Sequence, residues 1–173
     1  MDQAEALKLG VEPYLGYGEF SYSARASTDS TGGSDSQTGP LLGGKGGVFL
    51  SEKFWVALDY HLGGPYNLEN NEVEYLNRMW GVGIGAIKKN ALRAWVGYYY
   101  SNELDDTETG AIFKGRALKA SVGYAFQDRL SINLEFSKQE FSEVRSQGQT
   151  LSTPSTLDVS GIYLTLSSPL QLN

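Results

Sequence analysis

The chain has 173 residues, of which 40% are hydrophobic and 20% charged, and its formal net charge is −6. This length suits one domain, and the acidity argues against a general nucleic-acid-binding protein. Cysteine is absent, which excludes disulfide staples, cysteine-ligated metals and thiol chemistry. Glycine and tyrosine are abundant (21 and 11 residues) and proline is scarce (5), a composition that favours strands and turns over helices.

No apolar run approaches the roughly 18 residues that a membrane helix needs. The longest, 79–87, is interrupted by three glycines. Hydropathy by itself therefore favours a soluble protein. This test does not detect membrane barrels, because their apolar residues alternate with polar ones instead of running together.

Apolar residues alternate with polar or small residues along most of the chain, most clearly over 54–62, 92–100, 118–126 and 130–136. Because successive side chains of a strand point to opposite faces, this pattern predicts strands with two unlike faces. With the weaker segments added, the sequence predicts eight strands, near 8–26, 40–50, 54–64, 75–87, 91–101, 112–126, 130–141 and 158–168.

Tight and long connections alternate between these strands. Three are tight turns, at 51–53, 88–90 and 127–129, and the long connections are 27–39, 65–74, 102–111 and 142–157. This order indicates an antiparallel up-and-down meander with all tight turns at one end. We expect the eight strands to close into a barrel, forming a single domain over residues 1–173.

Alternation leaves open whether the apolar face fills a soluble, lipocalin-like barrel or faces lipid. The polar face is rich in glycine, for example Gly81, Gly83 and Gly85, which would weaken a solvent-facing strand. Inside a narrow eight-stranded barrel, small residues make room for a few large ones. The sequence therefore predicts an all-β, membrane-spanning antiparallel barrel with short periplasmic turns and long extracellular loops.

Charges on the polar face are few and balanced between acids and bases. They are Glu12, Asp59 and Glu135 against Lys45, Arg93 and Lys119. The tight turn at 51–53 sets Lys45 opposite Asp59, and the turn at 127–129 sets Lys119 diagonal to Glu135. Arg93 would face Gly85 and so be free to reach Glu12 across the lumen. We predict an ionic network inside the barrel, the alternative being chance pairs on a surface.

Aromatic residues form two bands, one toward each end of the predicted strands. Phe54, Tyr124 and Phe126 lie toward the tight turns. A larger group lies toward the long loops: Tyr17, Phe20, Tyr22, Tyr60, Tyr66, Tyr75, Trp80, Tyr98 and Tyr100. Two such girdles are typical of lipid-facing barrels, although cross-strand packing accounts for some of these residues. For Phe20 and Tyr22 to face out, the first strand must change face near Gly18 through a bulge.

The segment GVEPYLGYGEF (10–20) resembles the first strand of the small bacterial outer-membrane barrels of the OmpA, OmpX and OmpW type. The run 161–166, GIYLTL, is similar to the C-terminal signal of such proteins, but seven residues follow it and the usual terminal aromatic is missing. The resemblance implies an outer-membrane location, with the outer-membrane assembly machinery and outer-membrane lipids as partners. An exported protein would have lost its signal peptide, because the start MDQAEALK does not have that pattern.

The sequence carries no clear catalytic or metal-binding motif. His61 is the single histidine and shares a face with Asp59, but no serine follows at a local spacing that would complete a triad. The acidic segment 102–108 lacks the spacing of a calcium loop, and GGKGG (43–47) lacks that of a phosphate loop. We therefore predict no catalytic residue, no metal and no cofactor.

Four cations, Arg78, Lys114, Arg116 and Lys138, fall in the outward series near the long-loop ends. At the bilayer midplane each would cost about 2–4 kcal/mol, but close to zero near the interface. We expect contact with lipopolysaccharide phosphates there, or else ordinary charges at loop bases.

The leading functional interpretation is a monomeric, non-enzymatic outer-membrane protein, either a structural anchor or a surface-contact protein with a charge-plugged lumen. The alternatives are a narrow, OmpW-like channel for small or hydrophobic solutes and, third, a lipid A-modifying enzyme.

Overall fold

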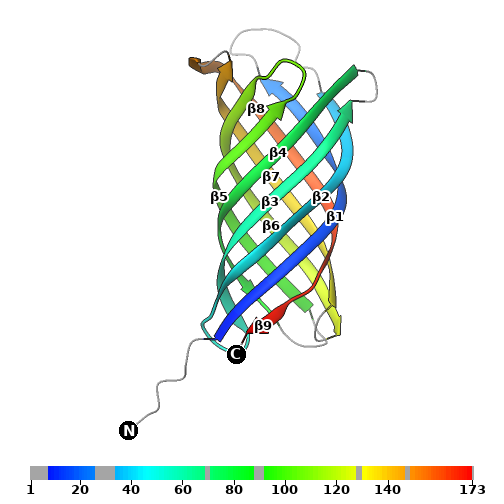
Figure 1. The fold of residues 1–173 in the computed structure, drawn as a ribbon, viewed down its shortest axis with the longest axis vertical. Helices are drawn as coiled ribbons and strands as arrows, with labels where there is room; N and C mark the ends of the chain where they lie inside the picture. Colours follow the sequence, from blue (N-terminus) through cyan, green and yellow to red (C-terminus); the bar gives the residue numbers. More distant parts are fainter. Residues whose placement is uncertain are drawn as a thin grey trace.

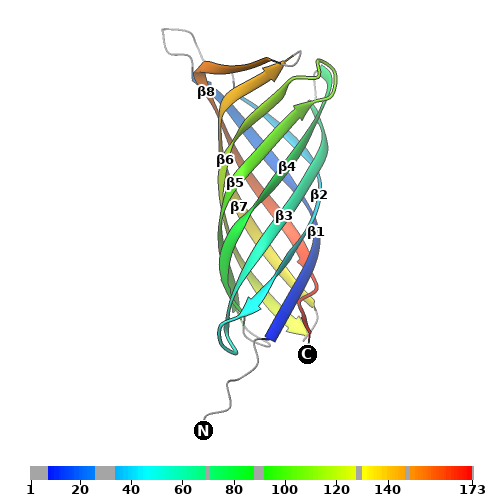
Figure 2. The same ribbon diagram turned by 60° about the vertical axis from the view of Figure 1, so that its left-hand side comes forward.

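The computed structural model describes residues 8–25, 34–68, 71–87, 92–127, 130–146 and 149–172. They form one continuous antiparallel sheet that closes on itself (Figures 1 and 2). Its strands are β1 (Lys8–Arg25), β2 (Ser34–Phe49), β3 (Phe54–Leu68), β4 (Asn71–Ala86), β5 (Leu92–Asp106), β6 (Ile112–Gln127), β7 (Leu130–Ser146), β8 (Gln149–Ser167) and β9 (Leu170–Leu172).

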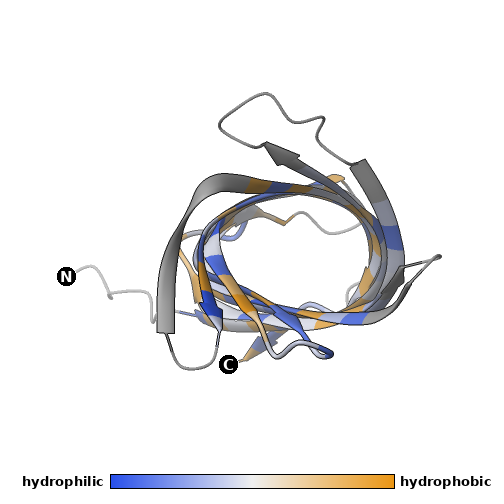
Figure 3. Ribbon diagram, turned by 90° about the horizontal axis from the view of Figure 1, so that it is seen from above, coloured by the Kyte–Doolittle hydropathy of each residue, from blue (hydrophilic) through white to orange (hydrophobic). Residues whose placement is uncertain are grey.

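Each of the first eight strands pairs with its neighbour in the chain, and β8 pairs with β1 to close the ring. Figure 3 looks along the barrel and shows this closure. The side chains that fill the ring are buried ones such as Trp55, Lys119 and Tyr163. Closure gives the backbone groups of the eight strands partners on both sides, which a membrane interior requires. The eight-stranded membrane-barrel architecture predicted from the sequence is confirmed. Within the described ranges, no helix is long and apolar enough to cross a membrane.

The short strand β9 has no counterpart in the predicted strands. After Ser168 and Pro169 the chain resumes antiparallel pairing, with Leu170–Leu172 against Val11, Gly10 and Leu9 of β1. The sequence did not predict β9, because a strand of three residues is too short to show an alternation of apolar and polar residues.

The strands run further toward the long-connection end than the sequence predicted. β5 continues to Asp106, β7 to Ser146, and β8 begins at Gln149, so much of the predicted loops 102–111 and 142–157 is strand. Similarly, β3 and β4 cover most of 65–74, and β2 begins at Ser34 inside the predicted loop 27–39. Backbone pairing continues there without an apolar contrast between the faces, which is why the alternation gave no signal.

The apolar face of the barrel points outward over its middle. Leu58, Val96 and Leu134 are 58%, 56% and 39% exposed, and they alternate with buried inward residues. An outer wall of this kind would aggregate in water, and it suits lipid contact. Inward glycines make room for large rings: a Cβ on Gly83 would lie 2.4 Å from the Trp95 ring.

Two aromatic residues expected in the outer girdle, Phe20 and Tyr66, lie inside the barrel instead. The pairing of β1 with β2 runs from Lys8 to Ser23 without a shift, so the predicted change of face near Gly18 does not occur. Phe20 is 2% exposed and packs edge-on against Tyr66, with ring centroids 4.1 Å apart. Tyr22 and Tyr75 pack partly buried against the same interior cluster. The outward girdle is therefore smaller than predicted, with Tyr17, Tyr60, Trp80, Tyr98 and Tyr100 exposed on the outer wall.

Candidate functional site

The six charges predicted for the lumen are all buried inside the barrel: Glu12, Lys45, Asp59, Arg93, Lys119 and Glu135 are each 7% exposed or less. They come from six different strands, β1, β2, β3, β5, β6 and β7. Because isolated charges cannot be left in a low-dielectric interior, such a set is stable only when its members pair.

Lys119 is the centre of the network. Its Nζ lies 3.0 Å from Asp59 Oδ2 and 3.1 Å from Glu135 Oε2. Asp59 also accepts hydrogen bonds from the Tyr14 hydroxyl, at 2.7 Å, and from the Tyr99 hydroxyl. The ammonium and the two carboxylates thus tie the walls formed by β3, β6 and β7 together across the lumen.

A second pair lies toward the tight-turn end. Arg93 Nη2 donates to Glu12 Oε2 at 2.6 Å, across the barrel, and Arg93 Nη1 donates to the Ser167 hydroxyl at 3.2 Å. Lys45 lies opposite Asp59 in the strand register, but its ammonium is 4.0 Å from Glu135 and sits over the Tyr14 ring. The backbone register of Lys45 therefore follows the sequence pattern, whereas its ion-pair partner does not.

The register predicted for Arg93 is wrong by two residues. Gly85 of β4 lies opposite Trp95, and Arg93 lies opposite Gly123 of β6. The reach of Arg93 to Glu12 does not depend on that error, because both side chains point into the same narrow lumen.

Apolar and amide groups fill the barrel above and below the charges. Toward the tight turns, Trp55 packs against Phe49 and Trp95, with ring centroids 5.7 and 5.6 Å away. Toward the other end, the amides of Asn77, Asn102 and Gln139 hydrogen-bond together. A larger cluster lies in the upper part of the lumen: Tyr14, Phe20, Leu41, Tyr66, Leu104, Phe141, Val159 and Tyr163. The sequence does not predict this cluster, because it places Phe20 and Tyr66 in the outer girdle and Leu104 in a long loop.

His61 is fully buried within the lumen. Its ring lies 6.4 Å from that of Tyr14 and 5.6 Å from that of Tyr163, and neither ring nitrogen has a hydrogen-bond partner among the described residues. In this position the imidazole has no access to lipid or to the outer surface. The described residues include no group of three or more histidine, cysteine or acidic side chains that could hold a metal ion.

Three of the four cations predicted to contact lipopolysaccharide take part in ion pairs on the outer wall. Arg78 contacts Asp105 and lies 4.0 Å from Glu103, while Lys114 lies 3.1 Å from Glu103. Arg116 Nε lies 3.9 Å from Glu140 Oε2. Lys138 is exposed on the same wall. We call this set of opposite charges across β4–β7 the outer charge ladder. Contact of these cations with lipopolysaccharide stays a prediction.

Comparison with solved structures finds barrels of the same kind. The chain is 12% identical to neisserial surface protein A, with a TM-score of 0.53, and the match covers 90% of this chain and 96% of that one. It is 8% identical to Ail, the attachment invasion locus protein of Yersinia pestis, with a TM-score of 0.51 and coverage of 92% and 98%. No protein-family model and no curated protein matches the chain. Because the sequence identities are this low, the likeness shows the fold alone, which is that of a small outer-membrane barrel.

Proposed function

We propose that this protein is a non-conducting, non-enzymatic barrel of the bacterial outer membrane, which holds polar strand ends outside the membrane for contact at the cell surface. The observation that carries the proposal is the filled lumen. Three successive levels of side chains, the Trp55–Trp95 pair, the Lys119 network and the Phe20–Tyr66 cluster, occupy it.

Little space is left between the Trp55–Trp95 pair and the charged residues. Beside Arg93 and Glu12 there is a cavity of about 10 Å³, which is room for about one water molecule. A solute path would have to separate the Lys119 ammonium from both carboxylates and also displace the rings above them. This disfavours the channel interpretation.

The location of His61 disfavours an enzyme. A general base must reach the reacting group of its substrate. The His61 imidazole is instead enclosed by Tyr14, Tyr163 and the Lys119 network, on the far side of the barrel wall from any lipid substrate.

The extended strands support the surface-contact part of the proposal. β5 and β7 each continue several residues past the girdle level of Tyr100, and their outward residues there are charged or polar, such as Glu103, Asp105 and Glu143. Backbone pairing keeps this region of sheet ordered outside the lipid band. The similar Ail is named an attachment invasion locus protein, and a contact role for the present chain agrees with these projecting strands.

The proposal is tested by reconstituting the protein into liposomes loaded with potassium ions. Flotation of the liposomes verifies insertion, and ion efflux is recorded in parallel with steps in a planar bilayer. We expect efflux equal to that of protein-free liposomes and no conductance steps. Reproducible steps from fully inserted protein would replace this proposal with the channel interpretation.

A further inference from the structure

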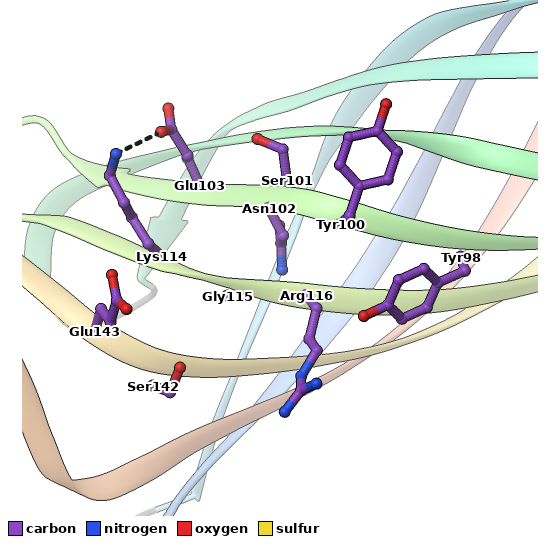
Figure 4. Close-up of a pocket in the computed structure, with 10 residues that line it drawn as sticks. All are labelled: Tyr98, Tyr100, Ser101, Asn102, Glu103, Lys114, Gly115, Arg116, Ser142 and Glu143. Carbon is purple, nitrogen blue, oxygen red and sulfur yellow. Dashed lines mark ion pairs between the residues drawn. The ribbon is translucent and has the colours of Figure 1, made fainter.

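An open pocket of about 380 Å³ lies on the outer wall across β5, β6 and β7 (Figure 4). Its residues are Tyr98, Tyr100, Ser101, Asn102, Glu103, Lys114, Gly115, Arg116, Ser142 and Glu143. The size falls within the range of small-molecule sites. The pocket has no part in filling the lumen or in closing the barrel.

Two bulges at the same height shape the pocket. Between Tyr99 and Asn102, β5 has one residue more than the facing part of β6. On the other side of β6, the pairing jumps from Phe141 to Glu143, so that Ser142 is the extra residue of β7. A bulge bends its strand and redirects the neighbouring side chains. Here both bulges flank Gly115.

The two ends of the pocket differ in chemistry. Tyr98 and Tyr100 lie at one end, 43% and 46% exposed, at the level of the outer aromatic girdle. Charged and hydroxyl side chains occupy the rest, with Lys114 bonded to Glu103 at 3.1 Å (Figure 4). Amphipathic rings beside dense hydrogen-bonding groups suit a molecule that has apolar faces and many hydroxyls.

The charged residues of the pocket also limit which ligands it can bind. The positive charges of Lys114 and Arg116 equal in number the negative charges of Glu103 and Glu143 among the pocket residues, so the site has no net charge to attract a bare phosphate cluster. The Arg116 side chain is less constrained than that of Lys114. It is 64% exposed, and its Nε lies 3.9 Å from Glu140 Oε2, which is a long distance for an ion pair. It can therefore turn toward one anionic substituent of a ligand, which its planar guanidinium binds with two parallel hydrogen bonds.

We infer that this pocket binds the saccharide headgroup of an anionic glycolipid, with a sugar ring against the tyrosines and an anionic substituent at Arg116. The acyl chains of such a lipid would continue down the apolar wall below, along Val96, Leu118 and Val122. This inference rests on the membrane orientation proposed above, with the long-connection end outside. The sequence predicted four separate contacts with lipopolysaccharide phosphates. The pocket is instead a single site, and only Lys114 and Arg116 of the four predicted cations belong to it.

The test measures lipid binding to the detergent-folded full chain by native mass spectrometry. The probe is purified lipid A, a phosphorylated and acylated glucosamine disaccharide, and the reference lipid is phosphatidylglycerol, which is anionic but lacks a sugar. We expect a tighter apparent Kd for lipid A, and a lowering of lipid A binding by soluble glucosamine 1-phosphate. That competition would show that the saccharide, and not the acyl chains, occupies the site.

The variant Tyr98→Leu with Arg116→Gln removes both ends of the proposed contact. Loss of one ring contact and of the charged hydrogen bonds from the guanidinium should weaken lipid A binding by roughly tenfold or more. The matched control is Tyr60→Leu with Arg145→Gln, which removes an outer-girdle tyrosine and an exposed arginine that do not line the pocket. We expect this control to stay within about twofold of wild type.

Three results would overturn the inference: unchanged binding by the pocket variant, an equal loss in the control, or equal affinity of the wild type for phosphatidylglycerol. The single changes Tyr98→Leu and Arg116→Gln keep the test valid if the double variant does not fold. Ion efflux is measured after the same purified proteins are reconstituted into liposomes. Because conductance and lipid binding are separate readouts, failure of the sealed-barrel proposal and failure of the glycolipid site can be told apart.

Discussion

The lumen network and the outer charge ladder use the same kinds of side chain in opposite surroundings. Inside, Lys119 has no exposed side-chain surface and holds two carboxylates within 3.1 Å. Outside, the side chain of Arg78 is 44% exposed beside Asp105 and Glu103. An ion pair that water can reach stabilises little, whereas a buried charge that loses its partner is costly. Burial, and not the number of pairs, therefore decides which charges hold this barrel together.

The largest effect is expected for Lys119→Met, which leaves Asp59 and Glu135 facing each other in the lumen without their shared cation. Breaking a buried pair typically costs about 3–5 kcal/mol. The free energy of unfolding, measured by urea titration of the bilayer-folded protein, should fall by about that amount. A loss below about 1 kcal/mol would mean that water reaches these carboxylates.

A somewhat smaller loss is expected on the lipid face, on the outer side of the wall that holds the lumen network. Arginine at Leu58, Val96 or Leu134 places a charge near the middle of the apolar band, which should cost about 2–4 kcal/mol. The same unfolding titration measures it, and Glu52→Arg in the exposed turn between β2 and β3 is the control. If purified wild-type protein stays folded and monomeric in buffer without detergent, the lipid-facing assignment is wrong.

The smallest effect is expected on the outer charge ladder. Arg78→Ala removes a partner of Asp105 and Glu103 but leaves Glu103 paired with Lys114 and both carboxylate side chains partly exposed, 19% and 30%. The expected loss of stability is about 0–1 kcal/mol, and it should shrink further in high salt. A salt-independent loss as large as that of Lys119→Met would show that the wall at this level is buried by lipid or by a partner.

The same comparison explains what the sequence could predict. Alternation and the turn at 51–53 give the register of β2 against β3, and from it the inward direction of Lys45 and Asp59. They do not give the partner of the Lys45 ammonium, because a long side chain in a narrow lumen can reach the carboxylates of several strands. Register is a property of two neighbouring strands, whereas ion pairing in a lumen depends on all eight.

The position of Phe20 and Tyr66 shows a second limit. From the sequence, an aromatic residue near a strand end fits an outer girdle as well as an interior cluster. The continuous pairing of β1 with β2 keeps Phe20 on the inward face, and the register shift between Gly63 and Tyr66 turns Tyr66 inward. The pocket on the outer wall was equally hidden, because the bulges at Ser101 and Ser142 leave no mark in the alternation. Gly115 was the available signal, since a Cβ there would lie 1.9 Å from the Glu140 carbonyl oxygen.

The most direct test of the account is a pair of double-mutant cycles, one on each region. The inner cycle combines Glu12→Gln with Arg93→Met, whose charged groups are 2.6 Å apart and buried. The outer cycle combines Asp105→Asn with Arg78→Met. We expect a coupling energy above about 2 kcal/mol for the inner pair and below about 1 kcal/mol for the outer pair, both from urea unfolding in bilayers. Inner and outer couplings that are both below about 1 kcal/mol would mean a hydrated lumen, and would contradict the sealed barrel.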